Sequence, residues 1–252
     1  GARAYFKAGK AVSDDMRRLI RNSDKVTFLK EYGHITKKLA KKGYSQEVID
    51  GAMERARKLR SMKPFVVNED NIEFFARLAR NYGDAVADHL VTLAKQFQGM
   101  KRKSKTIFKE YLDNTEFKFN LVDGKTVEDL YKREKEIKEL VRRAADNGSG
   151  KLKNKIADKK GKLVELKSVF FFRSTGASVY ENCRNKVIYK NLDTGDYVIV
   201  SKNTKKSQLP AGVDMQNRLG EFDLVVKSPY SKNEAWIVEC KNSKKKMSDA
   251  HE

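Results

Sequence analysis

The sequence predicts an α+β protein in which a helical region precedes a smaller region that contains β-strands. Three observations support this fold class. Apolar residues recur with helical spacing over about the first 145 residues. A cluster of turn-forming residues then interrupts the chain at 147–150, and short runs of β-branched and aromatic residues follow it. We therefore expect a basic helical domain over residues 1–150 and an α+β domain over residues 151–252.

The helical region contains helix starts and apolar stripes. Ser45, followed by Gln46 and Glu47, predicts a helix N-terminus, and the basic residues within 55–60 suit its C-terminal end. Thr126 starts the last predicted helix of the region. Apolar stripes predict two further helices on either side of a glycine at 83: Ile72, Phe75, Leu78, Ala79 and Tyr82 on the first, and Val86, Leu90, Leu93, Ala94 and Phe97 on the second.

The segment between the two predicted domains has few apolar residues. Residues 147–150 are Asn-Gly-Ser-Gly, and residues 151–162 are rich in lysine, so we expect the domain boundary there. Beyond it, Val169–Phe172 is a short apolar run that could complete a sheet. Ser178–Glu181 has the pattern of a capped helix start.

The remaining β-rich runs predict at least four strands. Residues 187–190 and 197–200 flank an Asp/Gly turn and predict a β-hairpin. Residues 221–227 and 234–241 are two further β-rich runs, separated by the polar segment 228–233. We expect an α+β domain with a small mixed sheet.

The charge of the chain indicates a polyanionic partner. Lys and Arg number 54 against 34 Asp and Glu, which gives a net charge of +20 and a pI near 9.7. The excess is +11 over residues 1–150 and +9 over the remainder, so it is not confined to a tail. Such a basic fold attracts phosphate backbones, and we expect nucleic acid as the partner. The alternatives are a charge that only maintains solubility, or a basic face that binds an acidic protein.

Several protein classes are excluded or disfavoured. No apolar stretch approaches the roughly 18 residues that would span a bilayer, so an integral membrane protein is excluded, and we expect no export signal at the N-terminus. Cys183 and Cys240 are too few for a disulfide framework. The histidines at 34, 89 and 251 are scattered, and none has zinc-ligand spacing with a cysteine.

Two β-rich runs carry a constellation of acidic and basic residues. Side chains alternate faces along a strand, so Glu239 and Lys241 project on the same side, and a hairpin would bring Asp223 close to Glu239. Carboxylate oxygens are the ligands that Mg²⁺ and Mn²⁺ prefer. A metal there could activate water for attack on phosphorus, and the Lys241 ammonium could orient that water or stabilise the developing charge.

These residues resemble the core of the PD-(D/E)xK nucleases, a superfamily that includes restriction endonucleases and Holliday junction resolvases. Residues 220–223 are Gly-Glu-Phe-Asp, and residues 237–241 are Ile-Val-Glu-Cys-Lys; Phe222 takes the place of the proline. The resemblance spans roughly residues 170–242, although only 11 residues follow Lys241, where the family usually continues with a helix and a strand. It implies single-step, metal-dependent hydrolysis of phosphodiester bonds.

The resemblance also implies roles for individual residues. Asp223, Glu239 and Glu181 would hold Mg²⁺ or Mn²⁺, with Zn²⁺ as a further possibility, and Lys241 would assist the water. Glu181 has an alternative role in a capping box with Ser178. Two further acids could serve the same site in reserve, Asp214 and Glu221. Four lysines near the strands could bind phosphate: Lys205, Lys206, Lys244 and Lys245. We expect the thiol of Cys240 in the core.

The layout of the chain is similar to the C-terminal toxin regions of contact-dependent inhibition proteins and related polymorphic toxins. Those pair a helical domain with a small C-terminal nuclease. This likeness implies an acidic immunity protein as partner, delivery as part of a larger secreted protein, and action in the cytoplasm of a target bacterium. We expect an endonuclease that cuts DNA, with tRNA as the second choice of substrate. The alternative is a non-catalytic nucleic-acid-binding protein.

Overall fold

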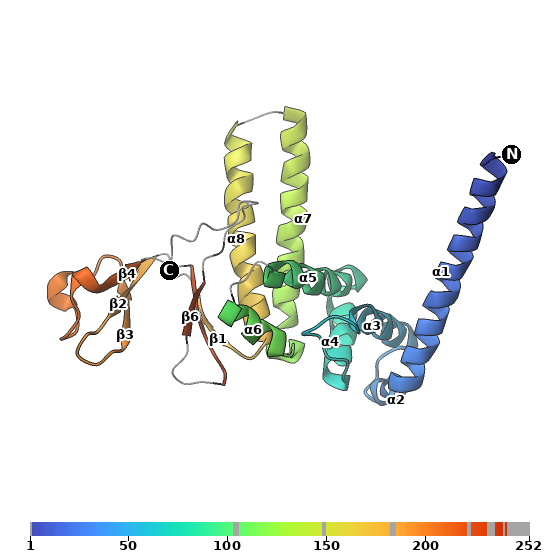
Figure 1. The fold of residues 1–252 in the computed structure, drawn as a ribbon, viewed down its shortest axis with the longest axis horizontal. Coiled ribbons are helices and arrows are strands. Elements are labelled where there is room, and N and C mark those ends of the chain that lie inside the picture. The colour runs from blue at the N-terminus through green and yellow to red at the C-terminus, as the bar shows by residue number, and fades with distance from the viewer. Residues whose placement is uncertain are drawn as a thin grey trace. The chain divides into compact units, whose positions relative to one another are not determined.

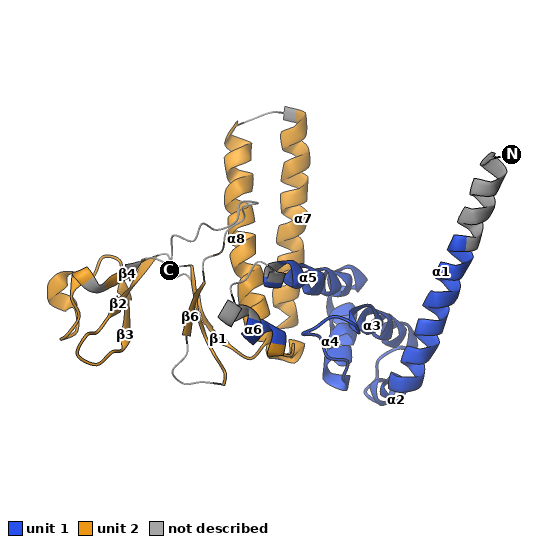
Figure 2. Ribbon diagram, viewed as in Figure 1, with its two compact units in different colours: residues 1–113 blue, residues 114–252 orange. Residues whose placement is uncertain are grey.

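The computed structural model describes residues 2–102, 106–147, 150–181, 185–220, 223–230, 235–238 and 240. It is an α+β protein, as the sequence predicts, with helices and small antiparallel sheets (Figure 1). The chain divides into two compact units, residues 1–113 and 114–252 (Figure 2). The sequence predicts a boundary after residue 150, but this position is the start of a helix, Gly150–Ser174, inside the second unit.

The first unit is helical. The predicted helix start at Ser45 is confirmed, since its side chain accepts a hydrogen bond from the backbone N of Val48. Asn68 caps the next helix in the same way, through the backbone N of Asn71. The helices are α1 (Ala2–Tyr32), α2 (His34–Lys41), α3 (Gln46–Leu59), α4 (Glu69–Tyr82), α5 (Asp84–Arg102) and α6 (Thr106–Asn114).

The second unit begins with a short 3₁₀ turn, η1 (Phe119–Leu121), and an antiparallel pair of helices, α7 (Gly124–Asn147) and α8 (Gly150–Ser174) (Figure 1). Two ion pairs link these helices, Lys159 with Glu136 at 2.8 Å and another between Lys167 and Glu134 at 3.4 Å. No helix in the described part of the chain is both long and apolar enough to cross a membrane.

Residues 151–172 differ most from the structure that the sequence predicts. The lysine-rich segment is the first half of α8, and the apolar run Val169–Phe172, which the sequence offered as a possible strand, forms its last turns. All four residues of that run are buried. A short apolar run fits a buried strand or a helix buried on all sides, because neither leaves a polar face. Ile156 and Leu163, seven residues apart, extend the buried helix face toward the N-terminus.

Two three-stranded antiparallel sheets complete the second unit. The predicted hairpin at 187–200 is confirmed, as is the pairing of the two later β-rich runs. Every strand pairing in the described residues is antiparallel, where the sequence predicted a mixed sheet. Sheet A has the order β1 (Ser178–Tyr180), β5 (Leu224–Lys227), β6 (Ala235–Val238); sheet B has the order β3 (Tyr197–Ser201), β2 (Lys186–Lys190), β4 (Arg218–Gly220).

The helix start predicted at Ser178 is wrong. Residues 178–180 form strand β1, in which Ser178 pairs with Lys227 and Val179 with Val226. The reason lies in the preceding turn: Gly176 has φ of +86°, a left-handed conformation that ends α8 and directs the chain to the sheet. Because Ser178 lies in a strand, the capping box with Glu181 does not form.

Both faces of β5 are covered. Val226 is fully buried, and α8 packs against β1 and β5. Val225, whose side chain points to the opposite face, forms a buried contact with Ile188 of sheet B. The central strand of sheet A is therefore a rigid base for the residues at its ends.

Candidate active site

The strand order of sheet A determines which chain segments meet at one of its ends. β5 is the central strand, and β1 and β6 pair with it in antiparallel fashion. Tyr180, the last residue of β1, pairs with Val225, and Val238, the last residue of β6, pairs with Leu224. The chain therefore leaves β1 and β6 at the same end of the sheet at which it enters β5. We call this the site end of sheet A.

Two of the predicted metal ligands lie at the site end. Asp223 directly precedes β5, and Glu181 directly follows β1. The topology brings these two residues to the same end of the sheet although 41 residues separate them in sequence. The other predicted residues of this group, Glu239 and Lys241, and the reserve acid Glu221 lie outside the described residues.

A hydrogen bond to the main chain holds the Asp223 carboxylate. Its Oδ2 accepts a hydrogen bond from the backbone N of Cys240 at 2.8 Å, and the residue is half-buried. This bond ties the start of β5 to the chain just beyond β6. A charged acceptor makes such a bond stronger than a neutral one, so the orientation of the carboxylate is fixed at the site end.

The Cys240 thiol is directed elsewhere. Its Sγ lies 3.6 Å from Oγ of Ser168 on α8, and the residue is half-buried. The main chain at Cys240 thus contacts Asp223 while its side chain contacts the helix. The sequence predicts a core thiol, whereas the structure places Cys240 half-buried, with its thiol directed toward α8.

Glu181 has a partner that the sequence did not indicate. Nη1 of Arg173, in the last turn of α8, lies 3.6 Å from Oε1 of Glu181. The side chains are 44% and 36% exposed, so the pair is worth little as a stabilising contact. A guanidinium beside Glu181 has the geometry to bind a phosphate through two parallel hydrogen bonds.

The predicted phosphate-binding lysines are only partly described. Lys205 and Lys206 are exposed, at the start of the 3₁₀ turn η3 (Lys206–Gln208) that follows β3. The reserve acid Asp214 caps a second 3₁₀ turn, η4 (Met215–Asn217), by accepting a hydrogen bond from the backbone N of Gln216. This local bond accounts for Asp214 without a metal. Lys244 and Lys245 lie outside the described residues.

The donor set at the site end fits a hard divalent cation. Asp223 and Glu181 both offer carboxylate oxygens, the ligands of Mg²⁺ and Mn²⁺. Among the residues that the structure describes, no three His, Cys, Asp or Glu side chains gather as a metal site, and the third predicted ligand, Glu239, lies outside them.

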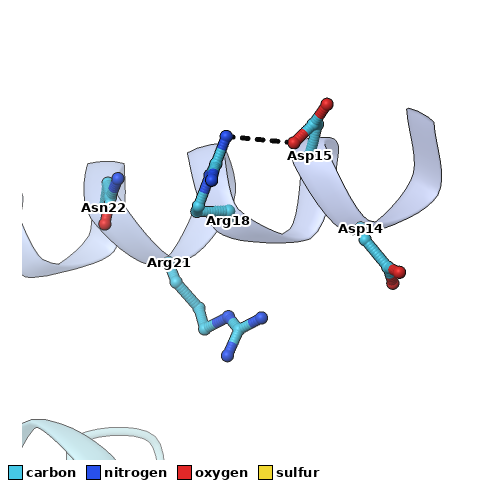
Figure 3. Close-up of a pocket in the computed structure, with 5 residues that line it drawn as sticks. All are labelled: Asp14, Asp15, Arg18, Arg21 and Asn22. Atoms are coloured by element: carbon cyan, nitrogen blue, oxygen red, sulfur yellow. Dashed lines mark hydrogen bonds and ion pairs between the residues drawn. The ribbon is translucent and has the colours of Figure 1, made fainter. Parts of the chain in front are cut away.

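A surface hollow elsewhere in the chain does not compete with this site. It is lined by Asp14, Asp15, Arg18, Arg21 and Asn22 of α1, in the first unit (Figure 3). Its lining comes from one exposed helix, and Nη2 of Arg18 already pairs with Oδ1 of Asp15 at 3.0 Å. Such a hollow has no second wall with which to enclose a ligand.

Comparison of the chain with models of protein families, with curated proteins and with solved structures finds no match. The functional proposal therefore depends on the chemistry of the residues at the site end of sheet A.

Proposed function

We propose that the chain is a metal-dependent endonuclease that hydrolyses phosphodiester bonds in DNA or tRNA. One observation carries the proposal: β1 and β6 flank β5 in antiparallel fashion, so Glu181, Asp223 and the exit of β6 toward the Glu-Cys-Lys sequence 239–241 share one end of a sheet. The net charge of +20 supports a phosphate-rich substrate.

The residues have distinct roles in this proposal. Asp223 and Glu181, with Glu239, would hold Mg²⁺ or Mn²⁺ through carboxylate oxygens. The bound cation would polarise a phosphoryl oxygen and lower the pKa of a coordinated water. The backbone N of Cys240 orients the Asp223 carboxylate. Lys241 would orient the attacking water, and Arg173 would bind the phosphate from the helix side.

Cleavage of plasmid DNA and of total tRNA by the purified chain tests the proposal. Reactions contain Mg²⁺, Mn²⁺, Zn²⁺ or EDTA, and the variants are Asp223→Asn, Lys241→Ala and, as a matched control, Asp214→Asn. Asparagine keeps an oxygen that can accept the Cys240 hydrogen bond but removes the charge that binds a metal. We expect metal-dependent cutting that falls by about 10³-fold in the first two variants, roughly 4 kcal/mol of transition-state stabilisation.

The control variant should cut as the parent does, because Asp214 caps a local turn. Absence of cutting on both substrates, cutting that persists in EDTA, or full activity of Asp223→Asn would each contradict the proposal.

A second candidate function is a non-catalytic nucleic-acid-binding protein. The observation that favours it is the run of exposed lysines in the first half of α8, which needs no metal to bind phosphate. This function predicts salt-sensitive binding that EDTA does not change, together with no cleavage.

The proposed nuclease also suits a toxin that is delivered to the cytoplasm of a target bacterium and neutralised by an acidic immunity protein. The basic surface supports this extension by charge complementarity. Co-expression with the product of a neighbouring gene of acidic composition should yield a stoichiometric complex in which cleavage is blocked. A complex that leaves cleavage unchanged would contradict the extension.

A further inference from the structure

The first half of α8 carries an unusual excess of positive charge. Between residues 151 and 162 there are six lysines and one acid, Asp158. We call this segment the basic half of α8. Over its whole length the helix has eight Lys and Arg residues against two acids.

Only part of this charge is paired within the protein. Lys159 pairs with Glu136 at 2.8 Å, and Lys162 pairs with Glu165 at 3.1 Å. The other four lysines are exposed, and no carboxylate of the described residues lies within ion-pair distance of them: Lys151, Lys153, Lys155 and Lys160.

The neighbouring helix shows what a balanced surface looks like. α7 has seven Lys and Arg residues and six acids. Lys132 pairs with Glu128, and Glu139 binds both Arg142, at 2.8 Å, and Arg143, at 3.1 Å. The charges of α7 thus largely cancel at the surface, whereas those in the basic half of α8 do not.

The fold does not account for the unpaired lysines. Lys151 and Lys153 lie near the start of the helix, where the helix dipole favours acidic residues, and the first turn of α8 contains no acid. Ile156 and Leu163 supply the buried contacts in this part of α8. The lysines therefore add repulsion within the chain, which a polyanionic partner would relieve.

We propose that the basic half of α8 binds the phosphodiester backbone of nucleic acid. This inference rests on the proposed function, because it assigns the grip on the substrate to the same compact unit that holds the site end of sheet A. From Lys151 to Lys160 the helix rises roughly 14 Å, a length over which duplex DNA presents several phosphates. Lysine side chains are flexible point charges that contact phosphates and not bases, so we expect this binding to be independent of base sequence.

The test compares two variants of the full chain that lose the same charge. Lys151, Lys153 and Lys160 change to Gln in the first; in the control, Lys132, Arg142 and Arg143 of α7 change to Gln. Binding of a labelled 20-base-pair duplex and of labelled tRNA is measured by fluorescence anisotropy between 50 and 300 mM salt, without divalent metal. Exposed lysine-to-glutamine changes on a helix cost little stability, and thermal melts verify that both variants fold.

We expect the α8 variant to bind at least ten-fold more weakly at 150 mM salt. The slope of log affinity against log salt concentration should become less negative by about 2 to 3, because binding releases about 0.9 fewer counterions for each phosphate contact that is lost. The α7 control should change affinity less than three-fold. The two nucleic acids show whether the grip prefers a duplex or a folded RNA. Equal weakening of both variants, or unchanged binding by the α8 variant, would overturn the proposal.

A cleavage assay separates this proposal from the catalytic one. If no substrate is cut while the α8 variant still loses binding, the catalytic function fails and the phosphate-binding surface stands. If the α8 variant cuts with unchanged KM, the surface fails and the catalytic function stands.

Discussion

The two halves of α8 have opposite surroundings although they form one continuous helix. The basic half carries exposed lysines on either side of a narrow buried stripe, whereas the half from Leu163 to Ser174 is buried on nearly all sides, with Val169–Phe172 consecutively buried. Neighbouring elements cause the difference: α7 covers one stripe of the first half, while sheet A and η1 also pack against the second. The buried half of α8 thus anchors the helix in the second unit, and the basic half exposes positive charge to solvent.

Truncation of the buried half should have the largest effect on stability. Phe172 is 1% exposed, and its change to Ala should lower the free energy of unfolding of the second unit by about 3–5 kcal/mol, because it removes apolar contacts and leaves a cavity. Urea unfolding followed by circular dichroism measures this. A loss below about 1 kcal/mol would show that the buried half does not anchor the helix.

Arg173 is the exception in the buried half, since its side chain is exposed and reaches Glu181. The change Arg173→Gln should lower cleavage by about 10- to 100-fold, roughly 1.4–2.8 kcal/mol of transition-state stabilisation, with little change in stability. Steady-state kinetics and a thermal melt separate the two effects. An activity equal to that of the parent would remove Arg173 from the site.

The paired lysines of the basic half should be detectable through their partners. Lys159 donates a hydrogen bond to Glu136 and holds the pKa of that carboxyl below its ordinary value of 4.5. The pair therefore stabilises the fold above the pKa of the unfolded chain, and this contribution is lost as the pH falls through the lower folded pKa. In Lys159→Gln the pKa of Glu136 should rise toward its ordinary value, measured by NMR titration. An unchanged pKa would contradict the pairing.

The unpaired lysines should have the smallest effect on stability. Changing Lys151, Lys153 and Lys160 together to Gln should alter the free energy of unfolding by no more than about 0.5 kcal/mol, since these side chains are exposed and unpaired. The same urea experiment measures this. A clear loss of stability would assign these lysines to the fold rather than to a partner.

Local signals made part of this structure predictable from the sequence. The strands at 187–190 and 197–200 follow from β-rich runs around an Asp/Gly turn. The pairing of Leu224 with Val238 follows from two β-rich runs joined by a short polar segment. Asp223 contacts the main chain at Cys240, whereas Glu239, which the sequence expects near Asp223, lies outside the described residues. Neither prediction needs knowledge of distant contacts.

Long-range contacts decided the rest. The local Ser-x-x-Glu pattern at 178–181 predicts a helix start, but β1 forms there because Val179 pairs with Val226, a residue far along the chain. Burial on all sides erased the helical period of Val169–Phe172. The contact between Arg173 and Glu181 depends on the left-handed turn at Gly176, which a sequence pattern alone does not specify.

Binding of Mn²⁺ to the full chain tests most directly whether the site end of sheet A holds a metal. Isothermal titration calorimetry would compare the parent with Asp223→Asn and with Asp214→Asn, an acid of the same unit that caps a local turn. We expect the parent and Asp214→Asn to bind Mn²⁺ alike and Asp223→Asn to bind it at least ten-fold more weakly. No binding by the parent, or equal binding by Asp223→Asn, would contradict a metal site at Asp223.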